Sequence, residues 1–235
     1  SALLLLGHRD AGAKRYEKLA ASLFGTSEVI RRDSGFRLLD CRGPLAGTAV
    51  PDSRLEFTAA GLDLVAIKGA FAAGKLDPGT KQLLEAMGEP DWLGGRDVLD
   101  LGCGYGLLTV LAAGAGARSC GVDDDLAAVR SSELNAAALG LGGNVSVVHS
   151  DLDTELAPDR KFDTVLMNPP FHVGRGVRLD LPRAFIRAAH RRLERGGELW
   201  LVANRALPYE RLFGDWSGLR TVRDESGFKV LRAVR

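Results

Sequence analysis

Short apolar segments alternate with amphipathic stretches through most of the second half of the chain. Strands are predicted at residues 98–101, 119–122, 145–148 and 162–167, and helices at residues 107–113, 126–139 and 182–193. Strand and helix follow each other in turn, and such alternation builds a parallel sheet with helices on both faces. The pattern therefore predicts an α/β fold whose ligands bind at the carboxyl ends of the strands, beside the switch in strand order.

The two ends of the chain follow one plan of strand, short helix and hairpin. The segments are residues 3–6 (a buried strand), 16–24, 29–31 and 36–39 near the start, and residues 199–202, 209–213, 219–223 and 228–231 near the end. Even the turn recurs, as Ser34-Gly35-Phe36 and Ser226-Gly227-Phe228. This similarity suggests two copies of one domain with only the tail of the first present, although two unrelated hairpins could share a turn tripeptide.

This repeat predicts that the chain is divided into three parts. Residues 1–43 are expected to be the remnant of an N-terminal domain lost by truncation, proteolysis or gene erosion. Prolines mark residues 44–53 as a linker. Residues 54–235 form the main domain, which opens with a hairpin and a helix whose N-cap is Asp77 and whose first helical residue is Pro78.

Composition narrows the class of protein. The 235 residues are 46% hydrophobic, enough for one sizeable core with an appendage, and the formal net charge of +1 means that any nucleic-acid surface is a local patch. The 3 cysteines form no Cys-x-x-Cys pair and have no histidine at ligand spacing, which predicts reduced thiols, a cytoplasmic location and no metal site. The opening apolar run is too short to span a bilayer, so no membrane partner is expected. A monomer is expected.

Each of the four central strands ends in residues that suit a nucleoside ligand. They are the loop from Asp100 to Gly106, then Asp123 with Asp124, then Ser150 with Asp151, and finally Asn168. Glycines allow close approach of the backbone, and an acid about 20 residues beyond a glycine loop can hold ribose hydroxyls. Singly, these residues could equally form a tight turn, a helix cap or a loop acid. Their order on successive strands makes the joint signal strong.

The fourth strand ends in Asn168-Pro169-Pro170-Phe171. The two prolines fix φ, lack N–H groups and disfavour helix for the residue before them, so the asparagine sits on a stiff extended backbone. Such a corner suits a planar group with an exocyclic amine, because oxygens accept its N–H bonds while Phe171 stacks on its face. A proline-rich strand exit with Phe171 as a plug in the core would show the same residues.

With these motifs, residues 54–235 resemble the Rossmann-like S-adenosylmethionine-dependent methyltransferases with an Asn-Pro-Pro-Phe signature. Within them the chain is most similar to the bacterial ribosomal small-subunit RNA guanine-N2 methyltransferases. The matching segments are residues 70–72, 76–80, 100–106, 168–174, 201–204 and 207–209. The resemblance implies a mostly parallel seven-stranded sheet with an antiparallel C-terminal hairpin. It also implies a degenerate methyltransferase-like domain in front, whose last elements residues 1–43 resemble.

The resemblance implies a role for each motif residue. Asn168, Pro169, Pro170 and Phe171 would be catalytic, accepting hydrogen bonds from the target amine and stacking on the base. The expected contacts of S-adenosylmethionine are Asp100, Gly102, Cys103, Gly104, Gly106, Asp123, Asp124, Ser150, Asp151, Leu152 and Asn168, with Phe71 and Lys75 on a covering loop. The expected partner is ribosomal RNA, most simply 16S rRNA, or a ribosomal subunit.

A basic stretch follows the signature. Between residues 172 and 195 only Asp180 and Glu194 oppose seven arginines, namely Arg175, Arg178, Arg183, Arg187, Arg191, Arg192 and Arg195. The predicted RNA contacts are His172, Arg175, Arg178, Arg187 and Arg191, with a solvated helix face as the alternative.

Three other functions remain open at this point. They are methylation of large-subunit rRNA, methylation of a protein glutamine, whose side chain also presents a planar NH₂, and cofactor-dependent RNA binding without catalysis.

Overall fold

The computed structural model describes residues 2–46, 53–170 and 180–235 of the chain. The chain divides into two compact units, residues 1–52 and 53–235. No helix within the described ranges is long and apolar enough to cross a membrane.

The larger unit contains the predicted alternation of strands and helices. Its strands are β4 (Arg54–Ala59), β5 (Leu62–Ile67), β6 (Asp97–Leu101), β7 (Arg118–Asp123), β8 (Val145–His149), β9 (Phe162–Met167), β10 (Leu193–Asn204), β11 (Ser217–Glu225) and β12 (Phe228–Val234). Its α-helices are α2 (Pro78–Met87), α3 (Leu107–Gly114), α4 (Leu126–Ala138) and α5 (Asp180–Arg192), with 3₁₀ turns η2 (Pro90–Leu93) and η3 (Tyr209–Leu212).

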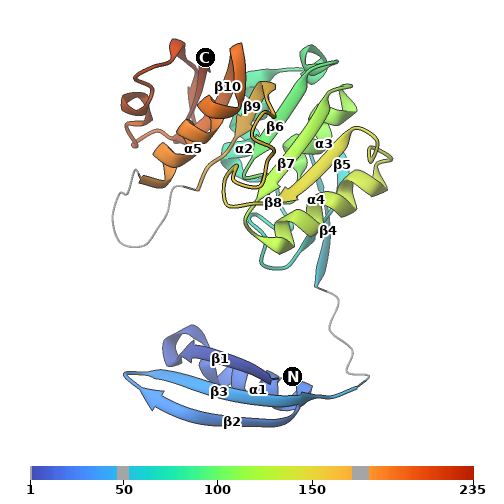
Figure 1. Ribbon diagram of the computed structural model, residues 1–235, viewed down its shortest axis with the longest axis vertical. Helices are drawn as coiled ribbons and strands as arrows, with labels where there is room; N and C mark the ends of the chain where they lie inside the picture. Colours follow the sequence, from blue (N-terminus) through green and yellow to red (C-terminus); the bar gives the residue numbers. More distant parts are fainter. Residues whose placement is uncertain (1, 47–52, 171–179) are drawn as a thin grey trace. The chain divides into compact units, whose positions relative to one another are not determined.

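Seven of these strands form one twisted sheet in the order β11-β12-β10-β9-β6-β7-β8 (Figure 1). Strands β10, β9, β6, β7 and β8 run parallel, whereas β12 and β11 are antiparallel to their neighbours. The predicted fold class is therefore confirmed. The strand order reverses at β6, which lies between β7 and β9, so the switch point is located where β6 and β9 end.

Alternate residues of the central strands enter two cores on opposite faces of the sheet. On β9, Val165 and Met167 pack with α5, while Leu166 packs with α2 and α3 on the other face. The same alternation holds along β10, where Leu201 and Val202 face opposite cores. Strands buried on both faces explain the nearly continuous apolar runs of the sequence.

The β4–β5 hairpin is fastened to α4 by a buried amide. Asn135 accepts from the Val65 N–H at 2.7 Å and donates to the carbonyl oxygens of Val65 at 2.9 Å and Tyr105 at 2.8 Å. These bonds satisfy polar groups at the free edge of β5 that would otherwise be buried unpaired. The hairpin leads directly into the loop that carries Phe71.

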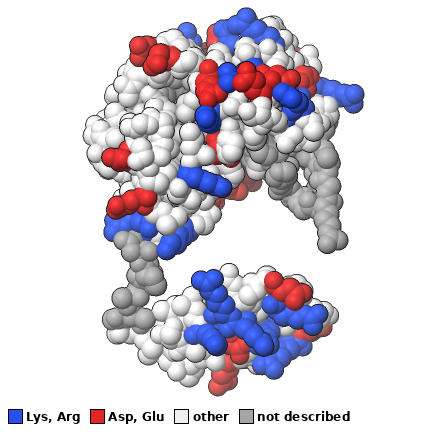
Figure 2. Space-filling model, turned by 180° about the vertical axis from the view of Figure 1, so that it is seen from behind, with Lys and Arg blue, Asp and Glu red and all other residues white. Residues whose placement is uncertain are grey.

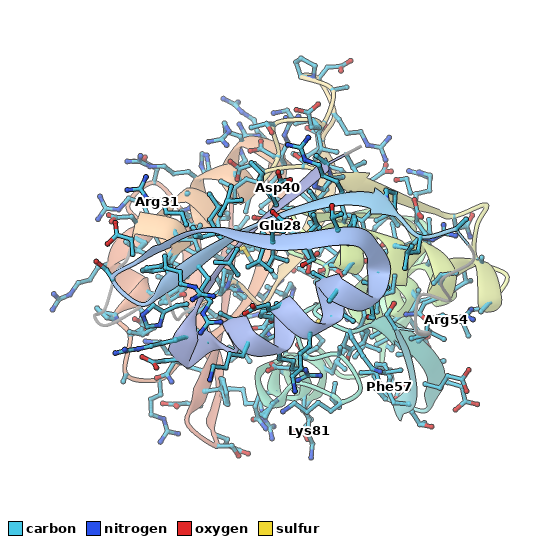
Figure 3. All side chains as sticks on the ribbon, turned by 90° about the horizontal axis from the view of Figure 1, so that it is seen from below. Glu28, Arg31, Asp40, Arg54, Phe57 and Lys81 are labelled. Carbon is cyan, nitrogen blue, oxygen red and sulfur yellow. The ribbon has the colours of Figure 1, made fainter. Side chains whose placement is uncertain are left out.

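The smaller unit contains β1 (Ala2–His8), η1 (Arg9–Ala11), α1 (Ala13–Leu23), β2 (Phe24–Asp33) and β3 (Phe36–Pro44). Its sheet has the order β1-β3-β2, and Ala20, Leu39 and Cys41 form a small core beneath α1. Lys and Arg side chains cluster on one face of this unit (Figure 2). The register pairs Glu28 of β2 with Asp40 of β3 (Figure 3).

The smaller unit and the end of the larger unit share topology and register. In each, a strand pairs antiparallel with the second strand of the hairpin that follows: β1 with β3, and β10 with β12. Even the closing bonds correspond, because Arg9 N donates to Gly35 O and Arg205 N donates to Gly227 O, both at 2.9 Å. The repeat seen in the sequence is thus a repeat of structure.

One expectation from the sequence is wrong. Residues 3–6 were expected to be a buried strand, yet Leu4 and Leu6 are 63% and 65% exposed. The reason is that β1 lies at a sheet edge and α1 covers only one face. The helix predicted at residues 182–193 is confirmed as α5, whose described part begins at Asp180, and Pro182 lies near its N-terminus, where no N–H is required.

Candidate active site

A cavity of about 400 Å³ opens at the carboxyl ends of β6, β7, β8 and β9. Its walls come from the strand-end loops, from the loop after β5 and from the first turns of α5. The lining residues are Gly69, Phe71, Leu101, Gly102, Val122, Asp123, Asp124, Asp125, Ser150, Asp151, Leu152, Asn168, Pro170, Leu181 and Phe185. The site thus lies at the topological switch point, as predicted.

The cavity is acidic. Its lining includes four aspartates and, among the described residues, no lysine or arginine. Asp123 is fixed by the backbone, since its carboxylate accepts from Gly104 N at 2.8 Å and from Asp125 N at 3.0 Å. Burial raises the pKa of Asp123 even though these two bonds oppose the shift. A rigid carboxylate at this position suits ribose hydroxyls, and the surrounding field favours a cationic ligand.

The glycine loop after β6 lines a second, smaller cavity that adjoins the first. Gly102 and Gly106 have φ of 81° and 85°, in the left-handed region that favours glycine. A Cβ on Gly102 would lie 3.3 Å from the Phe185 ring, and a Cβ on Gly106 would lie 2.2 Å from Ser132 Oγ. The first glycine therefore lets α5 approach the loop, and the second lets α3 pack on α4.

Asp100 is buried at the base of this loop. It accepts from Thr109 Oγ1 at 2.7 Å and from Thr109 N at 3.0 Å. Burial raises its pKa to about 7 despite these bonds, and the nearby charge of Asp123 adds to the rise. The folded protein therefore holds this carboxyl partly protonated near neutral pH.

The Asp100→Asn variant is expected to alter the pH dependence of stability. The unfolded carboxyl titrates near about 4, so between about pH 4 and about pH 7 the folded state binds a proton that the unfolded chain has released. The free energy of unfolding contributed by Asp100 thus falls as the pH rises through this window. Thermal unfolding should measure the free energy of unfolding of Asp100→Asn minus that of the parent. This difference should be about 1 to 3 kcal/mol larger at about pH 8 than at about pH 5.

Asp97 offers the matched control for this experiment. Its pKa is lowered, chiefly by the hydrogen bond from Arg118, so its contribution has the opposite sign and is lost as the pH falls. Asp97→Asn should lose stability relative to the parent at neutral pH and lose less in acid. Parallel curves for the parent and Asp100→Asn would show that burial does not shift this carboxyl.

Asn168 follows β9, and two residues near the start of α2 fix its carboxamide. The Nδ2 group donates to Asp77 Oδ2 at 2.8 Å and to Thr80 Oγ1 at 2.9 Å. Asp77 also caps α2, because the same oxygen accepts from Thr80 N at 2.9 Å. Both N–H bonds of the carboxamide are used, so a flip that exchanged its nitrogen and oxygen would lose two hydrogen bonds.

The oxygen of this carboxamide has no partner in the described part of the chain. Asn168 Oδ1 is buried and accepts no hydrogen bond from any described residue. A buried acceptor without a donor costs free energy, typically about 1–3 kcal/mol, so such an atom calls for an explanation. A donor supplied from outside the chain, at the meeting point of the two cavities that Asn168 lines, would complete it.

The loop after β8, which brings Ser150, Asp151 and Leu152 to the cavity, is held by a buried arginine. Arg192 of α5 donates to Asp153 Oδ2 at 2.7 Å, and also to the carbonyl oxygens of Asp153 at 2.8 Å and Ala157 at 2.6 Å. Hydrogen bonds from Arg191 and Arg192 lower the pKa of Asp153 although burial opposes the shift. Arg192 thus belongs to the interior and not to the basic surface with which its place in the sequence groups it.

Arg192→Met is expected to destabilise the larger unit by about 3–5 kcal/mol, because it leaves several buried carbonyls unpaired and the Asp153 carboxylate with only the exposed Arg191 as a partner. Arg191 is the neighbouring control, since it also bonds Asp153 but its side chain is 57% exposed. Arg191→Met should cost no more than about 1 kcal/mol. Equal losses in chemical denaturation would mean that the buried arginine does not hold the loop.

The structure brings most of the predicted residues to the two adjoining cavities. The larger one is lined by Phe71, Gly102, Asp123, Asp124, Ser150, Asp151, Leu152, Asn168 and Pro170, and the smaller by Phe71, Asp100, Gly102, Cys103, Gly104 and Asn168. Gly106 and Lys75 line neither, and the Lys75 carbonyl accepts from the Tyr105 hydroxyl. Pro169 is buried beside Asn168. Phe171, His172, Arg175 and Arg178 lie outside the described residues.

Sequence reasoning missed the residues that reach the site from distant segments. Phe185 and Leu181 close the larger cavity from α5, and Asp77 with Thr80 reach Asn168 across about ninety positions of sequence. The Asp77-Pro78 pattern signalled a helix cap, but nothing local to it pointed to Asn168.

Comparison with known proteins agrees with this geometry. The family model described as "Methyltransferase small domain" matches residues 61–232. The ribosomal RNA small subunit methyltransferase C of Chromohalobacter salexigens is 37% identical over 99% of this chain and 69% of its own length. The protein of the same name from Alcanivorax borkumensis is 37% identical over 73% of this chain and 52% of its own.

A solved structure matches the whole chain. It is the T. thermophilus 16S rRNA N2 methyltransferase RsmC in complex with AdoMet and guanosine, with a TM-score of 0.86 and 38% identity. The match covers 100% of this chain and 65% of that one, so the chain spans about half to two thirds of the length of these relatives. The chain belongs to the methyltransferase small domain family and, within it, to the ribosomal RNA small subunit methyltransferase C family.

Proposed function

We propose that the chain transfers a methyl group from S-adenosylmethionine to the exocyclic N2 amine of a guanine in small-subunit ribosomal RNA. The observation that carries the proposal is Oδ1 of Asn168, a buried acceptor that has no partner among the described residues and is held in one orientation by Asp77 and Thr80. The names of the relatives support the same reaction, since the T. thermophilus enzyme is described as a 16S rRNA N2 methyltransferase.

The residues around the two cavities fit the cofactor. When bound, S-adenosylmethionine supplies a methyl group activated by a positively charged sulfur. The fixed carboxylate of Asp123 would hold the ribose hydroxyls, and the glycine loop would contact the methionine part. Ser150, Asp151 and Leu152 would meet the adenine. The four aspartates of the larger cavity favour a cationic ligand over an anionic one.

Asn168 would act on the acceptor amine. The N2 lone pair of guanine is delocalised into the ring and is a poor nucleophile. Hydrogen bonds from N2–H to Asn168 Oδ1 and to the Pro169 carbonyl would draw the nitrogen toward tetrahedral geometry. Because these bonds strengthen as positive charge develops on the nitrogen, they stabilise the transition state more than the bound substrate.

The remaining requirement of the reaction is to position the target base beside the cofactor. The base must leave its stack to reach the cavity, and Phe171 is proposed to stack on it. No base with a tuned pKa is needed, because the methylated amine can lose its proton to water. Ribosomes are the source of this substrate, so we propose a cytoplasmic location.

The proposal is tested by supplying isotope-labelled S-adenosylmethionine with small subunits, large subunits, each naked rRNA and a glutamine-containing peptide in parallel. Label should enter small-subunit RNA, and digestion to nucleosides should yield N2-methylguanosine. Label in the peptide, in large-subunit RNA or in adenosine would overturn the proposal.

A further inference from the structure

A third cavity, also of about 400 Å³, lies on the other side of α5, between this helix and η3. Its lining residues are Arg183, Ile186, Arg187, His190, Arg191, Arg211, Leu212, Gly214, Asp215 and Trp216. We call this cavity the α5–η3 groove. Figure 1 shows α5 lying beside the C-terminal segment that carries η3. The residues that line the groove do not include any of those lining the candidate active site.

The groove is basic where the active-site cavity is acidic. Four arginines face a single aspartate, and Arg183, Arg187 and Arg211 are exposed and form no ion pair with any described residue. Residues 171–179, the stretch just before α5, contain no Asp or Glu that could neutralise them. Three arginines recur every fourth residue along α5, a step of about 6 Å, and so form a row of positive charge on one side of the helix.

The floor of the groove is aromatic. The His190 and Trp216 rings meet edge to face with centroids 5.1 Å apart, and Phe213 lies behind Trp216 at 5.5 Å. Burial lowers the pKa of His190, and the positive charges of Arg235 and Lys161 lower it further although Asp215 opposes them. A neutral imidazole and an indole edge give the groove donors and flat surfaces between the arginines, a combination typical of nucleic-acid sites.

Charge explains why a nucleic-acid substrate needs such a surface here. A guanine base is neutral and can enter a cavity lined by aspartates, but its phosphates are repelled by them. The phosphates must therefore find a cationic surface close by. Helix α5 forms one wall of each cavity, because Leu181 and Phe185 line the active-site cavity while Arg183 and Arg187 line the groove.

We propose that the α5–η3 groove binds the sugar-phosphate backbone of the substrate RNA beside the nucleotide that enters the active site. The inference rests on the proposed function for the identity of the substrate. It commits to RNA over an acidic protein because Arg183, Arg187 and Arg211 form no ion pair with any described residue, which leaves them available to phosphates, and because the aromatic floor suits bases.

The test measures RNA binding without turnover. A fluorescein-labelled single-stranded RNA decamer containing guanine is titrated with the full chain, and anisotropy is followed from about 50 to about 200 mM salt. Arg187→Gln with Arg211→Gln should lower the affinity at least fivefold, equally for unrelated sequences. The slope of log K against log salt should become shallower by about 1.4, the value for two lost contacts to a single strand.

The matched control is Arg220→Gln, which removes an exposed arginine of β11 outside the groove and should change neither quantity. All three arginines are on the surface, so thermal unfolding should be unaltered in every variant. An unchanged affinity and salt slope in the double variant would overturn the proposal, as would loss of binding to ribosomal proteins with RNA binding intact. Because no methyl transfer is measured, a wrong assignment of the methylated base would leave this result standing.

Discussion

Asn168→Ala is expected to lower the rate of methyl transfer by about 10²–10³-fold, on the scale of losing one oriented polar group at a developing charge. The side chain is only half-buried, and its nitrogen bonds two residues that have other partners, so the fold should survive. Cofactor affinity, measured by calorimetry, should remain within a few fold. Single-turnover transfer to the RNA substrate would then isolate the chemical step.

The control for Asn168 is a second asparagine of the same unit. Asn204 ends β10, and its side chain accepts from Ala206 N away from both cavities. Asn204→Ala should therefore leave transfer close to the parent rate. Full turnover by Asn168→Ala would remove the carboxamide from the mechanism, whatever the control shows.

Asp77→Ser together with Thr80→Val is expected to reduce transfer by about tenfold or more while leaving substrate KM and cofactor affinity nearly unchanged. Both substitutions remove acceptors of the Asn168 Nδ2 group, so the carboxamide becomes free to rotate and its oxygen is no longer fixed. Serine still caps a helix, so the N-terminus of α2 keeps its hydrogen bond. This double variant therefore tests the orientation of the Asn168 amide separately from the stability of α2.

Two further variants sharpen this experiment. Thr80→Ser restores the hydroxyl and should restore most of the rate when combined with Asp77→Ser. Asp77→Ala removes the cap as well and should cost about 1 kcal/mol in thermal unfolding, which the serine variant should not. A rate that follows stability across the set would show that Asp77 and Thr80 only support the helix.

Much of this site could be predicted from the sequence because its parts follow strands whose order along the chain sets their place. The ends of parallel strands meet at one edge, so Asp123, Asp151 and Asn168 could be assigned to one cavity from their positions in the sequence. The Asn-Pro-Pro corner was informative for the same reason, since proline fixes local conformation regardless of context.

What could not be predicted depends on contacts between distant segments. Nothing near Asp77 indicates that its carboxylate bonds Asn168 as well as capping α2. Arg192 looked like one more member of a basic run, yet its position on α5 turns it into the interior toward Asp153. The apolar run at 3–6 suggested burial, whereas its position at a sheet edge leaves Leu4 and Leu6 exposed.

Helix α5 carries three sets of side chains that point in three different directions, so their spacing along the helix must keep each set on its own side. Phe185 lines the candidate active-site cavity, Arg187 lines the groove and Arg192 holds the loop after β8. At 3.6 residues per turn, one inserted or deleted residue would rotate everything beyond it by about 100°. Evolution can therefore exchange residues along this helix with some freedom, but the number of residues in it is constrained.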